Sequence, residues 1–67
     1  MNYSFILEGE NIDGDFLQEE WEFENVESFY DACVLVEQEA EKLLKENGGG
    51  HIDIFDVEGN FINDIEI

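Results

Sequence analysis

The sequence contains almost no basic residues. Lys42 and Lys45 are its only cations, against 19 acidic residues, which gives a formal net charge of -17. Nucleic-acid phosphates are bound mainly by Lys and Arg, so this shortage argues against direct binding to DNA or RNA. Anionic membrane surfaces would likewise repel the chain. We therefore expect neither a nucleic acid nor a membrane as partner.

Other absences narrow the class further. The single cysteine, Cys33, has no partner for an internal disulfide, which is typical of a reducing compartment. No apolar run approaches the ~18 residues of a membrane span, and the first ten residues lack the basic segment of a secretory signal. These features predict residence in the cytoplasm of a host cell.

The chain nevertheless has the apolar content of a folded protein. Hydrophobic residues make up 43% of it and aromatic residues 13%, which is too much for a disordered acidic tail. A chain of this length can build one core of about 3 to 5 kcal/mol net stability, but not two. We expect residues 1–67 to form a single domain.

A first hairpin is predicted near the N-terminus. Tyr3, Phe5 and Leu7 alternate with other residues over positions 3–8, as in a strand with one buried face. Asp13-Gly14 is a strong tight-turn dipeptide. A second strand is expected at about 19–23, where Trp21 and other aromatic residues alternate with glutamates.

From Val26 the apolar spacing changes to three and four, which predicts an amphipathic helix. Its expected apolar positions are Val26, Phe29, Cys33, Val36, Ala40 and Leu43 or Leu44. Asn25 or Ser28 is the expected N-cap, and Asn47 with the glycines that follow ends the helix.

A second hairpin is expected after the helix, with strands at 51–57 and 61–67 joined by a turn at 58–60. The inward face of the first of these strands is left open, because Ile52 and Ile54 point one way and Phe55 and Val57 the other. The order ββαββ predicts an α+β fold, a four-stranded antiparallel sheet with one helix packed on a face.

This layout resembles a family of small uncharacterised ββαββ domains. The matching positions are Tyr3, Phe5, Asn25-Val26-Glu27, Ile52, Ile54, Asp56 and Gly59. Members of that family carry basic residues where this chain is acidic. The resemblance therefore implies the fold and no activity.

Catalytic and metal-binding motifs are not apparent. The acidic segment 9–20 fails as an EF-hand loop, because Gly9 falls at the first ligand position and no helix precedes it. Cys33 lies on the apolar stripe, and His51, which follows three glycines, is expected to be exposed. We expect no enzyme activity, no cofactor and no bound metal.

The carboxylates form an unusually unbroken array. Thirteen acidic residues and no basic one lie between Glu8 and Glu41. A compact chain of this length would be about 28 Å across, and duplex DNA, with one charge per ~1.7 Å, carries about 17 charges over the same length. The net charge of -17 therefore matches that of DNA per unit length. Alternate glutamates in a strand are about 6.6 Å apart, close to the ~7 Å that spans two phosphate repeats along one DNA strand.

In size, charge and layout the chain resembles the small acidic inhibitors encoded by phages and mobile elements, including anti-CRISPR proteins, anti-restriction proteins and inhibitors of uracil-DNA glycosylase. The resemblance implies a DNA mimic that occupies the nucleic-acid-binding surface of a basic host protein, such as a CRISPR effector or a restriction or repair enzyme. An antitoxin, immunity or adaptor protein that neutralises another basic partner is the alternative. A monomer or weak dimer is expected.

The expected contact residues are those of the first hairpin, where no lysine dilutes the charge. They are Glu10, Asp13, Asp15, Glu19, Glu20, Glu22 and Glu24, with Asp53, Asp56 and Glu58 as extensions across the sheet. Phe16, Phe55 and Ile62 are candidate apolar anchors.

Overall fold

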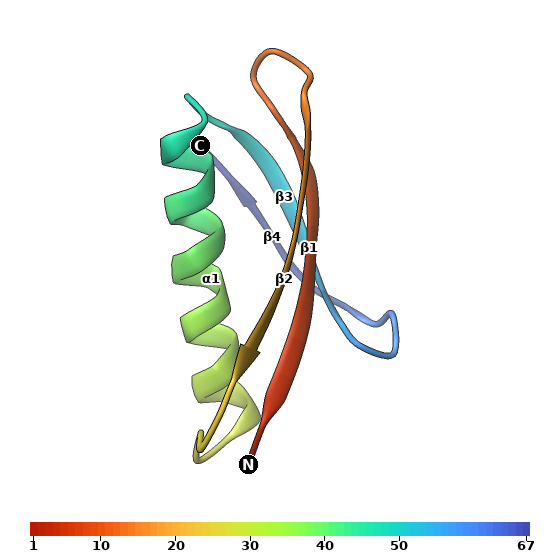
Figure 1. The fold of residues 1–67 in the computed structure, drawn as a ribbon, viewed down its shortest axis with the longest axis vertical. Coiled ribbons are helices and arrows are strands. Elements are labelled where there is room, and N and C mark those ends of the chain that lie inside the picture. Colours follow the sequence, from red (N-terminus) through yellow and green to blue (C-terminus); the bar gives the residue numbers. More distant parts are fainter.

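The computed structural model describes residues 1–67 and contains four strands and one helix. The elements, in chain order, are β1 (Tyr3–Asn11), β2 (Phe16–Phe23), α1 (Phe29–Glu46), β3 (Gly50–Asp56) and β4 (Phe61–Glu66). The strands form one antiparallel sheet in the order β2-β1-β3-β4, and α1 packs along one face of it (Figure 1). The α+β prediction of a ββαββ fold is confirmed.

Strand alternation divides the sheet into a helix-facing side and an opposite side. Leu7 in β1 lies across from Glu19 in β2 and from Ile54 in β3, so these positions share the helix-facing side. The buried side chains Phe5 and Leu7 come from β1, as the sequence predicts. Ile52 and Ile54 are fully buried too, which settles the face of β3 that the sequence left open.

The helix presents a narrower stripe than predicted. Its buried residues are Ala32, Val36, Ala40 and Leu44. Cys33 packs against the core as predicted but is only half-buried, and its neighbour Ala32 is the fully buried residue. Ala32 and Ala40 carry only a methyl group, so the larger buried side chains Phe5, Leu7, Ile52 and Ile54 of the sheet fill much of the core beneath the helix.

The start of the helix also differs from the simplest interpretation of its periodicity. Val26 is buried but precedes α1, and Ser28 is the N-cap, its hydroxyl accepting a hydrogen bond from the backbone N–H of Asp31 at 3.1 Å. Of the two predicted caps, Ser28 is therefore confirmed. Asn25 has a positive φ of 58° and lies in the link that precedes the helix.

The first hairpin is longer than predicted, since β1 continues to Asn11 and β2 begins at Phe16. The side chain of Asn11 makes this extension possible, because its Oδ1 accepts hydrogen bonds from the backbone N–H groups of Asp13 and Asp15. Gly14 occupies the positive-φ position of the turn at 85°. Turn-forming residues thus close the hairpin at its tip instead of ending the strands early.

The second hairpin contains an irregularity that shifts its alternation. Ile54 pairs with Asn63 while Phe55 pairs with Phe61, so Ile62 is an extra residue on β4. Such a bulge moves a side chain from one face to the other. Ile62 is half-buried and packs against the core, so its prediction as an exposed anchor is wrong.

The molecule is elongated, with Cα extents of 37 × 20 × 15 Å. Its net charge of -17 spread over the 37 Å axis gives one charge per about 2.2 Å. The charge is therefore sparser along the molecule than it would be on a globule of about 28 Å. Its helix does not combine the length and the apolar character that a membrane crossing would require.

Candidate protein interface

One face of the sheet is covered by α1 and the other by no element of the chain (Figure 1). We call this uncovered side the open face. Its residues follow from the register as Ser4, Ile6, Glu8 and Glu10 on β1, Phe16, Gln18, Glu20 and Glu22 on β2, His51, Asp53 and Phe55 on β3, and Phe61, Asp64 and Glu66 on β4. The open face contains no lysine or arginine.

Carboxylates occur in pairs at alternate positions along three of the four strands of the open face. The pairs are Glu8 and Glu10, Glu20 and Glu22, and Asp64 and Glu66. Members of a pair are about 6.6 Å apart along the strand. Asp53 on β3 adds a seventh carboxylate to the open face.

Three of these carboxylates form a row across the sheet. Asp53 is the register partner of Glu8 on one side and of Asp64 on the other. Neighbouring strands are about 4.8 Å apart, and like charges directly opposite one another destabilise a sheet. We call Glu8, Asp53 and Asp64 the acidic row. Only Gln18, which donates to Glu8 at 3.4 Å, offers this row a side-chain hydrogen bond.

The next positions along the strands form an apolar row. Ile6 is the register partner of Phe55, and Phe55 is the register partner of Phe61. The rings of Phe55 and Phe61 meet edge to face with centroids 5.9 Å apart. Phe61 is 59% exposed, while Ile6 and Phe55 are half-buried. We call Ile6, Phe55 and Phe61 the apolar row.

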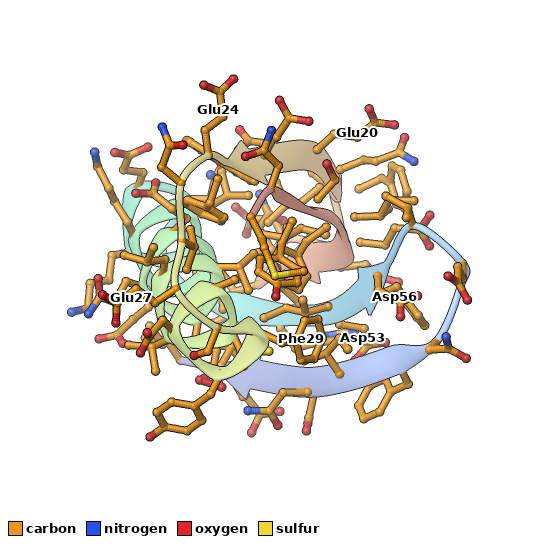
Figure 2. The ribbon with its side chains drawn as sticks, turned by 90° about the horizontal axis from the view of Figure 1, so that it is seen from below. Glu20, Glu24, Glu27, Phe29, Asp53 and Asp56 are labelled. Atoms are coloured by element: carbon orange, nitrogen blue, oxygen red, sulfur yellow. The ribbon has the colours of Figure 1, made fainter.

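Four of the predicted contact residues lie together on the open face. They are Glu10, Glu20, Glu22 and Asp53. In Figure 2, which looks along the length of the molecule, Glu20 lies away from α1 whereas Glu27 lies beside it. Glu22 accepts a hydrogen bond from the hydroxyl of Ser4 at 3.3 Å, which holds its carboxylate over the sheet.

Glu19 does not belong to this group. Strand alternation turns it toward the helix side, where its carboxylate accepts a hydrogen bond from the Trp21 indole Nε1 at 2.9 Å. It also lines a shallow groove between β2 and α1 with Trp21, Glu39, Lys42, Leu43 and Glu46. The sequence places Glu19 and Glu20 in one stripe, and the pleat of the strand separates them.

The remaining predicted residues lie at the two ends of the sheet. Asp13 and Asp15 are in the β1–β2 turn, and Asp56 and Glu58 are at the β3–β4 turn. Because Glu10 pairs with His51 while Phe5 pairs with Asp56, these turns lie at opposite ends (Figure 1). Glu24 lies in the link between β2 and α1. The predicted set is therefore not one continuous stripe.

Asp56 is engaged in the structure of its own turn. Its carboxylate accepts hydrogen bonds from the backbone N–H groups of Glu58 and Asn60, at 3.0 and 2.8 Å, and from the side-chain amide of Asn60 at 3.0 Å. The side-chain amide of Asn60 is the main cause that lowers the pKa of Asp56 below its ordinary value, and backbone N–H groups of the turn add to the effect.

Three carboxylates of the open face escaped the sequence prediction, namely Glu8, Asp64 and Glu66. Their signal was the alternation itself. Glu8 follows the buried Leu7, and Asp64 and Glu66 flank Ile65, which packs against the core. The bulge at Ile62 hides this phase in β4, since counting back from Ile65 would put Phe61 on the buried side.

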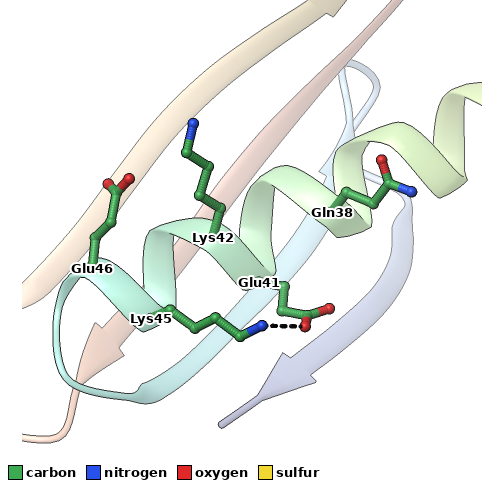
Figure 3. A pocket seen from close by; sticks show the side chains of 5 residues that line it. All are labelled: Gln38, Glu41, Lys42, Lys45 and Glu46. Carbon is green, nitrogen blue, oxygen red and sulfur yellow. Dashed lines mark ion pairs between the residues drawn. The ribbon is translucent and has the colours of Figure 1, made fainter.

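The outer side of the helix carries the only cations. Lys42 and Lys45 line a shallow depression with Gln38, Glu41 and Glu46 (Figure 3). Lys45 Nζ and Glu41 Oε1 are 2.9 Å apart and form the one ion pair between charged side chains. Figure 3 shows Lys42 without such a pair. The depression mixes both signs of charge, in contrast to the open face.

Candidate reactive groups are scattered through the structure. Cys33 is on the helix, where burial and the nearby charge of Glu37 raise the pKa of its thiol. No group of three or more His, Cys, Asp or Glu side chains is arranged to hold a metal ion. Comparison with protein-family models, curated proteins and solved structures found no match to this chain.

Proposed function

We propose that this chain is a non-catalytic, DNA-mimicking inhibitor that occupies the nucleic-acid-binding surface of a basic host defence protein, as anti-CRISPR proteins do. One observation carries the proposal: the charge of the chain is unneutralised. One of its 19 acidic side chains forms an ion pair, which leaves 18 without one, and no charged residue is buried.

The spacing of this charge supports the proposal. The net charge of -17, averaged over the 37 Å axis, corresponds to one negative charge per about 2.2 Å, against one per ~1.7 Å for duplex DNA. On the open face, the two carboxylates of each pair are about 6.6 Å apart along the strand. A groove whose lysines and arginines are spaced for two phosphate repeats along one DNA strand, ~7 Å, would meet anions at a similar interval.

Solubility alone does not account for the pattern. A net charge of about 2 to 8 is enough to keep a small domain soluble, and excess charge destabilises the compact state. The acidic row adds direct cross-strand repulsion at Asp53, which has a carboxylate on each side. An arrangement that opposes folding is consistent with selection for a partner that neutralises it.

Affinity capture with a DNA competitor tests the function. Tagged protein is incubated with lysates of CRISPR-bearing or restriction-proficient bacteria, and bound proteins are identified before and after addition of duplex DNA. We expect nucleic-acid-binding proteins that DNA displaces, and whose DNA cleavage the purified chain inhibits. Binding should also weaken steeply with salt, because opposite charges meet across the interface.

Two results would count against mimicry. Capture that duplex DNA does not reduce would show that the chain and DNA bind different surfaces. Capture of a basic toxin that does not bind DNA would instead support the antitoxin or immunity alternative.

A further inference from the structure

The acidic row and the apolar row lie side by side on the open face. Along β1, Glu8 and Ile6 are two residues apart, and along β3 the same spacing separates Asp53 and Phe55. Side chains at this spacing are about 6.6 Å apart on one face. Three carboxylates and three apolar side chains thus form one mixed patch across β1, β3 and β4.

The chemistry of this patch matches one side chain in particular. We propose that the mixed patch binds an arginine-bearing protein surface, in which guanidinium groups pair with the acidic row and lie against the rings of the apolar row. The inference rests on the proposed function only in taking a basic protein as the partner. It adds the surface that is used and the residue type that the surface selects.

Arginine can interact favourably with both the acidic row and the apolar row, whereas lysine interacts favourably only with the acidic row. A guanidinium group offers planar donors that match a carboxylate, is weakly hydrated, and stacks on aromatic rings. A lysine ammonium is a compact and strongly hydrated charge, so it pairs with carboxylates but loses more hydration against Phe55 and Phe61. A pure carboxylate surface would not distinguish the two cations in this way.

A second copy of the chain is a poor occupant of the same surface. Each molecule carries a net charge of -17, and two open faces in contact would bring seven carboxylates of each copy within one Debye length, about 8 Å. Charge complementarity therefore favours a basic partner over self-association, although Phe61 is well exposed.

Binding of defined peptides tests the proposal without knowledge of the natural partner. ¹⁵N-labelled protein is titrated with hexa-arginine amide and, separately, with hexa-lysine amide at 150 mM salt. We expect the largest amide shifts in β1, β3 and β4. We also expect hexa-arginine to bind about two- to fivefold more tightly, the range given by a guanidinium over an exposed ring.

Two matched variant pairs assign the effect to the patch. Phe61→Ala should remove most of the preference for arginine, while Tyr30→Ala, an equally simple change at a 75% exposed aromatic residue on α1, should keep it. The double variant Asp53→Asn/Asp64→Asn should lose more affinity for both peptides than the double variant Glu39→Gln/Glu46→Gln. The second variant removes the same amount of charge, but from the helix. Circular dichroism checks that each variant is folded.

Equal affinity of the two peptides for the wild-type chain would overturn the proposal, as would the largest shifts falling on α1 or equal losses in the two double variants. If those results came with DNA-displaced capture, the function would stand and only the surface would be wrong. If arginine selectivity at the patch came with capture that DNA does not affect, the surface would stand and the mimicry would fail.

Discussion

Trp21 and Glu19 are joined by a hydrogen bond between the indole Nε1 and a carboxylate oxygen, 2.9 Å long, on the helix-facing side of β2. The bond fixes an acidic residue beside an aromatic one at the edge of the core. Glu20, the next residue, is on the open face. Two neighbouring glutamates therefore have different roles, one structural and one at the surface available to a partner.

This difference is measurable in stability. Glu19→Ala leaves the half-buried indole N–H without its acceptor, so we expect a loss of about 1 kcal/mol in the free energy of unfolding. Glu20→Ala removes a charge from the open face and should leave stability unchanged or slightly raised. Urea unfolding followed by Trp21 fluorescence measures both. Equal effects of the two substitutions would contradict the assignment of Glu19.

A pH-dependent contribution is expected from Asp56. Because hydrogen bonds in the turn lower its pKa in the folded state below the ordinary 3.8, its ionised form contributes stability above that value. The contribution disappears as the pH falls through the lowered pKa. Asp56→Asn should therefore be less stable than the wild-type chain at pH 7, with a difference that shrinks below about pH 4.

Asp53→Asn is the matched control, since it removes the same charge by the same substitution. Asp53 lies between Glu8 and Asp64. We expect the Asp53→Asn variant to be more stable than the wild-type chain at pH 7, because the substitution relieves repulsion across the sheet. Thermal unfolding of both variants between pH 3 and pH 7 gives the comparison. Stabilisation by both substitutions at pH 7 would show that general repulsion outweighs the turn.

Close approach of β1 and β3 at Gly9 gives a third prediction. A Cβ atom at this position would lie 1.9 Å from the backbone oxygen of His51, so the strands must move to accommodate alanine. We expect Gly9→Ala to cost about 2 to 4 kcal/mol, in the range of strongly disruptive substitutions. Gly14→Ala, where no atom lies within 4 Å but φ is 85°, should cost only about 1 kcal/mol. Chemical denaturation distinguishes them.

The thiol of Cys33 should react slowly. Burial and the charge of Glu37 raise its pKa, which lowers the fraction of nucleophilic thiolate near neutral pH. We expect alkylation by iodoacetamide at pH 8 to be slower than for the urea-unfolded chain. Glu37→Gln should partly restore the rate, because it removes the repulsive charge while retaining an oxygen that can accept from Asn63. An unchanged rate would leave burial as the only cause.

Once a partner is identified by affinity capture, its rate of association tests which carboxylates of the chain it contacts. Reversing Glu20 and Glu22 to lysine changes the open face, whereas reversing Glu39 and Glu46 changes the helix side. We expect the first pair to slow association at least tenfold and the second about two- to threefold, because attraction between complementary surfaces mainly raises the association rate. Surface plasmon resonance at two salt concentrations measures both. Equal slowing would mean that charge acts only as a diffuse field.

Much of the fold could be predicted because local patterns and burial agree. Phe5 and Leu7 have the two-residue period of a half-buried strand, and Ser28 has the side chain that an N-cap requires. The alternation was less informative where the chain departs from regular geometry. The bulge at Ile62 is an example, because one extra residue reverses the phase of β4 and nothing in the sequence marks it.

The sequence by itself determined the net charge, the strand and helix order, and most of the buried residues of the sheet, since all of these follow from composition and short-range periodicity. Tertiary structure alone decided which carboxylates are neighbours. Glu8, Asp53 and Asp64 are far apart in the chain and form one row only because β1 pairs with β3 and β3 with β4 in a particular register. Register depends on packing against the helix and on turn geometry, so the acidic residues that share a face cannot be identified from their spacing along the chain.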